Sequence, residues 1–240
     1  MKTTLKLIAV FAIFAITACS KLDVVGNDSI RAFNDLLQSA PQLVSEDEEN
    51  NDWSISAPDN SARFSWSKNF AESSVFDVML EFAVAPFIAA GLDPAKLPDH
   101  FAQIPRRKDD WQKVSSEFIF KNGMLAVGTK LGTEQLKYNG EATPLASYQQ
   151  IVKLKRNSIG YHMQMDHYGI NMGNGNMFEW AKNLATNDKD IVFVLDPAPF
   201  IAAGTDPAKI EGWTFAKVTV DDENGKPVQV DKILKAFDLK

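Results

Sequence analysis

Residues 161–168 read Tyr-His-Met-Gln-Met-Asp-His-Tyr and hold the densest set of candidate metal ligands in the chain. The segment contains two of the three His residues and two of the seven Met residues. His and Met together suit Cu(I), whereas His with Asp suits zinc or iron. We expect one strand over residues 160–166, in which alternation divides these side chains between two faces. The candidate ligands are His162, Met163, Met165, Asp166 and His167.

Neither face of that expected strand has a standard spacing of metal ligands. A zinc site usually needs three or four protein ligands, and the third His, His100, lies far away in a Pro-Asp-His loop. We therefore favour packing of Met163 and Met165 in a core, with His162 on a polar face. No cofactor is expected, and a copper or zinc site is the less favoured alternative.

A twelve-residue segment occurs twice. Residues 85–96 read APFIAAGLDPAK and residues 198–209 read APFIAAGTDPAK, so 11 of 12 positions agree at an offset of 113 residues. The copies place Asp93 and Asp206 at matching positions, and two carboxylates that meet can do acid–base work, as in glycosidases. An Asp before Pro more often forms a turn, so we assign no catalytic residue.

Each copy is predicted to form a compact connector. Pro86 and Pro199 start a short helix that Gly91 and Gly204 end in a left-handed conformation, after which Asp-Pro begins another turn. Phe and Ile would anchor the connector on a sheet. The alternative is that the copies meet across a pseudo-twofold axis and line a groove for an apolar ligand or a partner segment. That candidate groove comprises Pro86, Phe87, Asp93, Pro199, Phe200 and Asp206.

Other catalytic and binding motifs are weak. Residues 173–176 read Gly-Asn-Gly-Asn before an expected helix, and helix starts with glycines can bind anions. The segment lacks the residues of a phosphate loop and the spacing of a dinucleotide fold, so a turn with a cap is favoured. The chain has no G-x-S-x-G motif, and its one cysteine is Cys19. Enzymatic activity is uncertain, and a non-catalytic role is favoured.

The repeat predicts an α+β fold of two similar halves, derived from an internal duplication. The offset is too long for a solenoid period, and each copy follows an apolar run typical of a strand buried on both faces. These runs cover residues 77–84 and 190–195. The halves cover residues 28–129 and 143–240, joined by a linker over 130–142, and each contains a helix, strands and a β-hairpin.

The remaining expected elements follow from periodicity, caps and turns. Asp28 and Thr143 can cap two amphipathic helices, and Asn176 with Glu179 three residues on resembles a capping box. The predicted helices cover residues 29–38, 145–156, 177–184 and 231 onward. Beyond the strands given above, one strand covers residues 62–67, and hairpins with Asn-Gly turns join residues 117–120 to 124–127 and 214–220 to 227–230.

Composition limits the class of protein. The 240 residues are 45% hydrophobic and 10% aromatic, which is enough for one or two packed domains. The formal net charge of -6 disfavours a nucleic-acid partner. One cysteine allows no internal disulfide, so stability must come from the core.

The N-terminus has the pattern of a secretory signal peptide. Lys2 and Lys6 precede an apolar run over residues 7–18, shorter than the roughly 20 residues of a membrane span. The run ends Ile-Thr-Ala-Cys19, which resembles the lipobox of bacterial lipoproteins. This resemblance implies a signal peptide over residues 1–18, a tether over 19–27, and acyl chains such as palmitate on Cys19. The alternative is an ordinary cleavage site beside a plain Cys.

These patterns predict a cell-envelope lipoprotein. By the same resemblance, Ser20 after the lipidated Cys directs such a protein to the outer membrane of a cell with two membranes. In a cell with one membrane the protein would face outward. We expect a non-catalytic module that binds a small molecule, a peptide or a protein of the envelope. The alternatives are an envelope hydrolase using carboxylates or a metal near residues 162–167, and a structural lipoprotein without a pocket.

Overall fold

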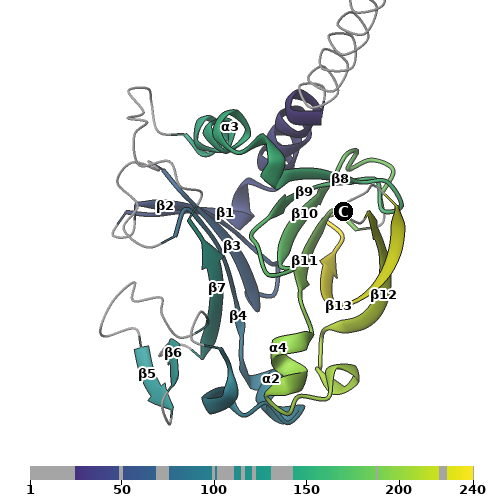
Figure 1. The fold of residues 1–240 in the computed structure, drawn as a ribbon. Helices are drawn as coiled ribbons and strands as arrows, with labels where there is room; N and C mark the ends of the chain where they lie inside the picture. Colours follow the sequence, from purple (N-terminus) through teal and green to yellow (C-terminus); the bar gives the residue numbers. More distant parts are fainter. Residues whose placement is uncertain are drawn as a thin grey trace, which may run out of the picture.

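The fold contains two antiparallel sheets with helices at both ends (Figure 1). The computed structural model describes residues 25–48, 51–68, 76–98, 101, 111–114, 117–120, 123–130, 143–187, 189–221 and 226–239. This mixture of helix and strand confirms the α+β class. The expected signal peptide, Cys19, His100 and most of the expected linker lie outside the described residues. In the described part of the chain, no helix is long and apolar enough to cross a membrane.

The first sheet has the strand order β1-β2-β3-β4-β7. Its strands are β1 Val44–Asp47, β2 Asp52–Ser56, β3 Ala62–Ser67, β4 Val78–Ala83 and β7 Met124–Thr129. The expected hairpin between residues 117–120 and 124–127 is wrong, because β7 pairs with β4. Leu125 and Val127 of β7 are buried there in the main core. The other expected arm, β6 Glu117–Phe120, pairs instead with β5 Trp111–Val114.

The second sheet has the strand order β12-β13-β11-β10-β9-β8. Its strands are β8 Ile159–His162, β9 His167–Asn171, β10 Met177–Ala181, β11 Ile191–Leu195, β12 Thr214–Asp221 and β13 Pro227–Phe237. All residues of β11 are buried, which confirms the expected strand with two covered faces. The hairpin of β12 with β13 is also confirmed.

The helices, turns and strands that build each sheet occur in the same order along the chain. In each case a helix and a 3-10 turn precede four sequential strands, then a short helix and a second turn, and a later strand returns beside the fourth. The first set comprises the helix over residues 25–39, η1 Pro41–Leu43, α2 Ala85–Ala89 and η2 Pro94–Lys96. The second comprises α3 Pro144–Leu154, η4 Arg156–Ser158, α4 Ala198–Ala202 and η5 Pro207–Lys209.

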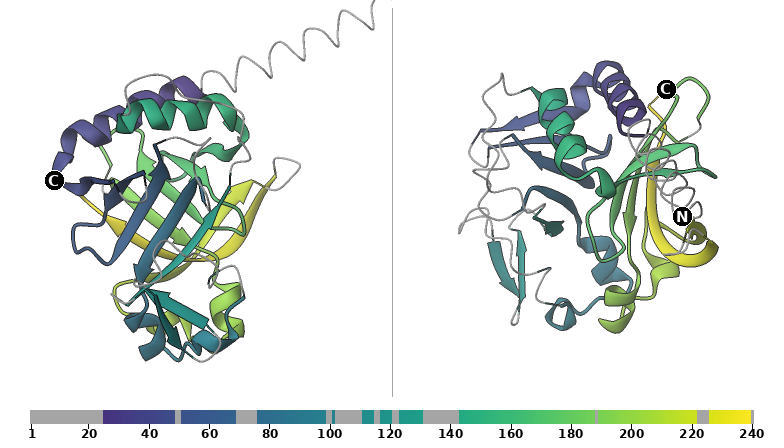
Figure 2. Two further views of the ribbon diagram at one scale, coloured as in Figure 1. Left: turned by 90° about the vertical axis from the view of Figure 1, so that its left-hand side faces the viewer. Right: turned by 45° about the horizontal axis from the view of Figure 1, so that its top comes forward.

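The two expected amphipathic helices are confirmed, but the first covers residues 25–39, so Asp28 lies inside it and does not cap it. The Thr143 side chain accepts a hydrogen bond from the Ala146 amide at 3.2 Å, and Pro144 takes the first helical position of α3. Both helices cover the same end of the two sheets, opposite α2 and α4 (Figures 1 and 2).

The helix expected over residues 177–184 is wrong, because residues 177–181 form β10. Phe178 and Trp180 alternate with Glu179, so a strand sends both aromatic rings to one face. The Asn176 side chain does not cap a helix. Its amide oxygen accepts a hydrogen bond from the Asp196 amide at 3.1 Å, which joins the end of the β9–β10 loop to the start of the loop after β11.

The closing helix expected from residue 231 is also wrong, because these residues continue β13. The apolar positions Ile233, Leu234 and Phe237 have a spacing that fits a helix. β13, however, lies between β12 and β11. A strand paired on both edges accommodates these side chains equally well, with Ile233 fully buried and Leu234 and Phe237 half-buried.

The strand expected over residues 160–166 is a hairpin instead. β8 ends at His162, residues 163–166 form the turn, and β9 begins at His167. Asp166 takes a φ of 53°, a left-handed conformation that Asp tolerates in turns. Met163, expected in a core, is 80% exposed in this turn.

The core between the sheets is aromatic. The rings of Phe64 on β3 and Phe178 on β10 stack with centroids 4.4 Å apart. Phe33, from the helix over residues 25–39, contacts two tryptophan rings. Its ring centroid lies 5.4 Å from that of Trp66 on β3 and 5.2 Å from that of Trp180 on β10. The pattern Phe-x-Trp therefore occurs on the third strand of each set. The Phe33 ring packs against the tryptophan of both strands.

Candidate functional site

The two copies of the repeated segment meet at one end of the molecule. The Asp93 amide donates to the Ala203 carbonyl at 2.9 Å, and the Asp206 amide donates to the Ala90 carbonyl at 2.8 Å. Each bond mirrors the other with the copies exchanged. The contact joins residues that are more than a hundred positions apart in the sequence.

Glycine permits this close approach. Gly91 and Gly204 have φ values of 104° and 96°, which confirms the left-handed ends expected for the short helices. A Cβ atom on Gly91 would lie 2.7 Å from the Gly204 carbonyl oxygen, far inside contact distance. The backbones of the two copies can therefore cross here only because Gly91 has no side chain.

The aromatic residues of the candidate groove are buried in the junction. Phe87 and Phe200 are fully buried, and their centroids lie 5.0 Å apart. Trp213 packs on Phe87 at 5.4 Å. These rings contact one another in the core and do not line an open groove, while Pro86 and Pro199 stay partly exposed.

Asp93 and Asp206 form turns, as favoured from the sequence. Their side chains accept hydrogen bonds from the amides of Ala95 and Ala208, each at 3.2 Å. Ion pairs join Asp93 to Lys96 at 3.2 Å and Asp206 to Lys209 at 2.8 Å. The hydrogen bond from Lys209 holds the pKa of Asp206 below its ordinary value. Solvent-facing carboxylates of this kind are suited to capping turns.

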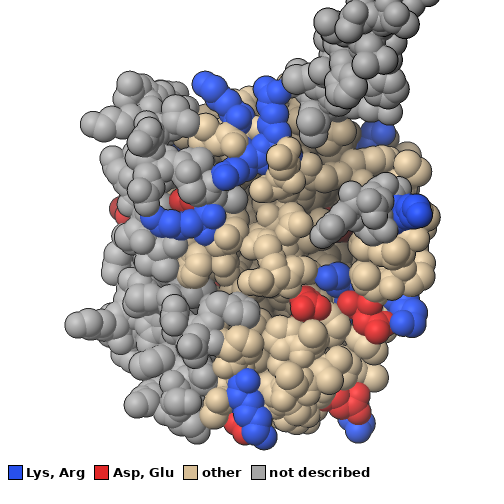
Figure 3. Space-filling view, viewed as in Figure 1, with Lys and Arg blue, Asp and Glu red and all other residues tan. Residues whose placement is uncertain are grey.

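The isoleucines of the repeat do not anchor it on the sheet, contrary to expectation. Ile88 is 46% exposed and Ile201 is 49% exposed, and they occupy matching positions. We call Ile88, Ile201 and their exposed neighbours Ala89 and Ala202 the repeat tip. In Figure 3, basic and acidic side chains lie side by side around the lower end of the molecule, with uncharged surface between them.

A second cluster with chemical potential surrounds Glu179 on β10. The carboxylate lies 3.5 Å from Nδ1 of His162 and 3.7 Å from Nδ1 of His167. Gly169 stands opposite Glu179 in the β9–β10 register, and a Cβ atom there would lie 3.1 Å from Cγ of Glu179. The missing side chain therefore gives Glu179 the space to reach both imidazoles.

The other ring nitrogens bind backbone carbonyls. Nε2 of His167 lies 2.6 Å from the Lys189 carbonyl oxygen. Nε2 of His162 lies 3.0 Å from the Thr219 carbonyl oxygen on β12. Because β8 and β12 are the two edges of the second sheet, this contact requires the sheet to curl until its edges approach (Figure 1).

The cluster holds an enclosed negative charge. Burial works to raise the pKa of Glu179, but hydrogen bonds and positive charge from His162 and His167 outweigh it and hold that pKa below its ordinary value. On β13, burial lowers the pKa of Lys232, whose Nζ donates to the Gly175 carbonyl at 2.8 Å. Glu179 is 3% exposed and His167 is 1% exposed, so neither presents its reactive atoms to a substrate in solution.

The hairpin separates most of the candidate metal ligands. His162 and His167 face Glu179, whereas Met163, Met165 and Asp166 lie in the turn. In the part of the chain that the structure describes, no group of three His, Cys, Asp or Glu residues is placed to hold a metal ion. Sequence reasoning missed Glu179 because it was assigned to a helix cap. Its place between two large aromatic residues was the available signal for a strand.

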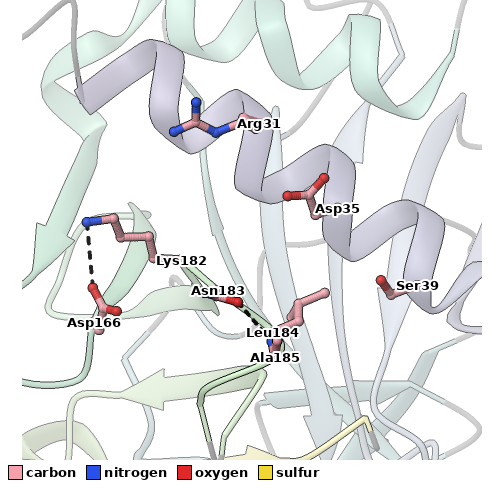
Figure 4. Close-up of a pocket in the computed structure, with 8 residues that line it drawn as sticks. All are labelled: Arg31, Asp35, Ser39, Asp166, Lys182, Asn183, Leu184 and Ala185. Atoms are coloured by element: carbon pink, nitrogen blue, oxygen red, sulfur yellow. Dashed lines mark hydrogen bonds and ion pairs between the residues drawn. The ribbon is translucent and has the colours of Figure 1, made fainter.

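A polar hollow lies between the helix over residues 25–39 and the loop after β10 (Figure 4). Its volume is about 480 Å³. It is lined by Arg31, Asp35, Ser39, Asp166, Lys182, Asn183, Leu184 and Ala185. Both cations have acidic partners, since Arg31 pairs with Asp28 at 2.8 Å and Lys182 pairs with Asp166 at 3.9 Å. The positive charges in the hollow are thus offset by neighbouring carboxylates.

Comparison of the chain with known protein families, curated proteins and solved structures gives no match. The repeat tip, the Glu179 cluster and the polar hollow differ in their geometry. The repeat tip is exposed and apolar, the Glu179 cluster is enclosed, and the polar hollow is open and neutralised by internal pairs.

Proposed function

We propose that the protein is an exported lipoprotein held on a membrane by acyl chains on Cys19. The support is the charged start, the short apolar run and the lipobox-like Ile-Thr-Ala-Cys19. Two or three chains anchor stably where one is marginal, at about 0.8 kcal/mol per buried methylene. Ser20 favours the outer membrane in a cell with two membranes. In a cell with one membrane the protein would lie on its outer face.

Palmitate labelling of growing cells tests the anchor. We expect the label on the wild-type protein and its loss in Cys19→Ala, with the variant retained at the size of the uncleaved precursor. Ser20→Ala is the matched control and should keep the label. A wild-type protein that carries no label would overturn the lipid anchor.

We also propose that the two halves arose by internal duplication. The repeat of 11 identical positions in 12 supports this, together with the shared order of helices, turns and strands. Phe64 with Trp66, and Phe178 with Trp180, add a second pair of matching positions on β3 and β10.

The function that the geometry supports best is non-catalytic binding of an envelope partner at the repeat tip. The observation that carries this proposal is the matching exposure of Ile88 and Ile201. Other identities in the repeat have structural reasons: Phe87 fills the core, Gly91 permits the crossing and Asp93 caps a turn. Packing gives no such reason for a large apolar residue that faces water in both copies.

Binding is better supported than hydrolysis. The cluster of acid–base groups around Glu179 is enclosed, with Glu179 and His167 almost completely buried. General acid–base catalysis needs the group within hydrogen-bond reach of the substrate. The exposed carboxylates of Asp93 and Asp206 are each engaged with their own turn and lysine.

Photo-crosslinking in cells tests the binding surface. A photoreactive amino acid at position 88 or 201 should give one discrete adduct, and Asp at the other isoleucine should abolish it. Position 163 is the control, because Met163 is the more exposed side chain but lies in the β8–β9 turn. Adducts of the same kind from all three positions, or from none, would overturn the repeat tip as the binding surface and leave a structural role.

A further inference from the structure

The second sheet is closed by a side chain instead of by a strand ladder. β8 and β12 end opposite sides of the strand order, and the described residues form no ladder between them. His162, the last residue of β8, reaches the Thr219 carbonyl oxygen of β12 at 3.0 Å. An edge strand normally leaves such backbone groups unpaired.

The second contact of the same ring restricts its protonation state. Nδ1 of His162 lies 3.5 Å from the carboxylate of Glu179, while Nε2 faces the Thr219 carbonyl. A neutral imidazole has one N–H donor and one acceptor, whereas the imidazolium form has two donors. A carboxylate and a carbonyl only accept. The ring therefore satisfies both neighbours at once only when both nitrogens carry protons.

We infer that His162 is a proton-dependent clasp that holds the β8–β9 hairpin against β12. With both ring protons present, one donor binds each side and the sheet is closed. When one proton leaves, one of the two contacts places a lone pair against an acceptor oxygen, and the hairpin is released from β12. This inference is independent of the lipid anchor and of the repeat tip.

Charged groups from the neighbouring strands act on the protonation of His162 in opposite directions. His167 on β9 presents its Nδ1 to the same carboxylate at 3.7 Å. Lys232 on β13 lies near enough to feel the charges of both Glu179 and Asp196, which follows β11. The Glu179 carboxylate favours the doubly protonated His162 ring, whereas positive charge on Lys232 works against it, so the closed state depends on Glu179 staying ionised.

Release of the clasp would uncover a defined surface. The face of the sheet that carries Glu179 and Lys232 also carries Val192 and Val194, which are buried in the closed state. A hairpin with a four-residue turn can move as a unit, since Tyr161 binds Asp166 within it at 2.5 Å. The clasp therefore controls access to a partly apolar, partly charged face.

A distance measurement tests the clasp directly. Spin labels are placed on Met163→Cys in the turn and Lys217→Cys on β12, in the full chain with Cys19→Ser so that no other thiol competes. Electron–electron double resonance is then recorded at about pH 6 and about pH 8.5, on either side of the ordinary His pKa of about 6.5. We expect one narrow, short distance at the lower pH and a longer, broad distribution at the higher pH.

Two further variants separate the clasp from general effects. His162→Ala should give the broad distribution at both pH values, whereas Gln164→Ala, in the same turn and exposed, should behave like the parent chain. A distance that does not change with pH in the parent chain, or that changes equally in His162→Ala, would overturn the proposal.

Nitrogen NMR of the wild-type chain provides a test that needs no folded variant. The chain has only three His residues, so the ring signals can be assigned. We expect both nitrogens of His162 to carry protons under the conditions that give the short distance. A neutral His162 ring in the closed state would contradict the inference, even if His162→Ala fails to fold.

Discussion

Nζ of Lys235 on β13 lies 3.0 Å from Oδ2 of Asp59, which belongs to the turn between β2 and β3 of the other sheet. The Lys235 side chain is almost completely buried. It also donates to the Gly212 carbonyl at 3.2 Å and lies 5.3 Å from the ring centroid of Phe237. One lysine thus connects the two sheets at a place where neither offers backbone pairing.

Replacing this lysine should destabilise the fold. Lys235→Met keeps the approximate length of the side chain but removes the charge. We expect the free energy of unfolding, measured in urea, to fall by about 1–2 kcal/mol. Lys217→Met is the matched control on the neighbouring strand, because Lys217 pairs with Asp231 at 2.9 Å on the surface. An exposed pair contributes about 0.2–1 kcal/mol. Equal losses in both variants would show that Lys235 adds nothing as a connection.

The crossing of the two repeats should be intolerant of any side chain. In Gly91→Ala a residue at positive φ would also place its Cβ atom 2.7 Å from the Gly204 carbonyl oxygen. We expect the free energy of unfolding to fall by roughly 3 kcal/mol or more. Gly123→Ala is the control, since Gly123 has a φ of 75° but nothing within 4 Å of the added Cβ. It should lose only about 1–2 kcal/mol. Thermal unfolding of both variants measures the difference.

The space beside Glu179 is expected to be as sensitive. In Gly169→Ala the new methyl group would lie 3.1 Å from Cγ of Glu179 and 3.2 Å from Cε of Met177. We expect a loss of about 1–2 kcal/mol, because the carboxylate must move away from the imidazoles. Gly160 is its partner across the β8–β9 pair and has nothing within 4 Å. Gly160→Ala should change stability by less than about 1 kcal/mol in denaturant titrations.

The Glu179 cluster should also produce a signature in acid. Because the folded state lowers the pKa of Glu179, its ionised form adds stability above the unfolded value, and this stability is lost as the pH falls through the folded value. Urea midpoints of the wild type should therefore fall more steeply with acid than those of Glu179→Gln. Glu211→Gln, at an exposed position, should follow the wild type. Parallel curves for Glu179→Gln and wild type would contradict the assignment.

The sequence predicts those elements whose local signals agree with their tertiary place. Thr143 and Pro144 mark the start of α3, and the uninterrupted apolar run of β11 marks a strand covered on both faces. The connector in each repeat follows from Pro, Gly and Asp-Pro, because all three act through the local backbone.

Local signals fail where a tertiary neighbour decides the conformation. Glu179 three residues after Asn176 fits a capping box, but Phe178 and Trp180 gain more by facing the aromatic core from a strand. Ile233 and Leu234 fit a helix until β11 and β12 occupy both sides. The meeting of Gly91 with Gly204 and the approach of His162 to Thr219 depend on sheet curvature and packing over long separations, which no local pattern encodes.

Each of the two helices over the aromatic core contacts both sheets. The Pro144 carbonyl of α3 accepts a hydrogen bond from Trp66 of the first sheet at 3.2 Å. Phe33, from the helix over residues 25–39, contacts Trp180 of the second sheet. The hydroxyl of Tyr148 in α3 donates to Ser29 at 2.9 Å. Because each helix packs on both sheets, the chain should unfold in a single cooperative transition, and neither sheet with its own helix should fold alone.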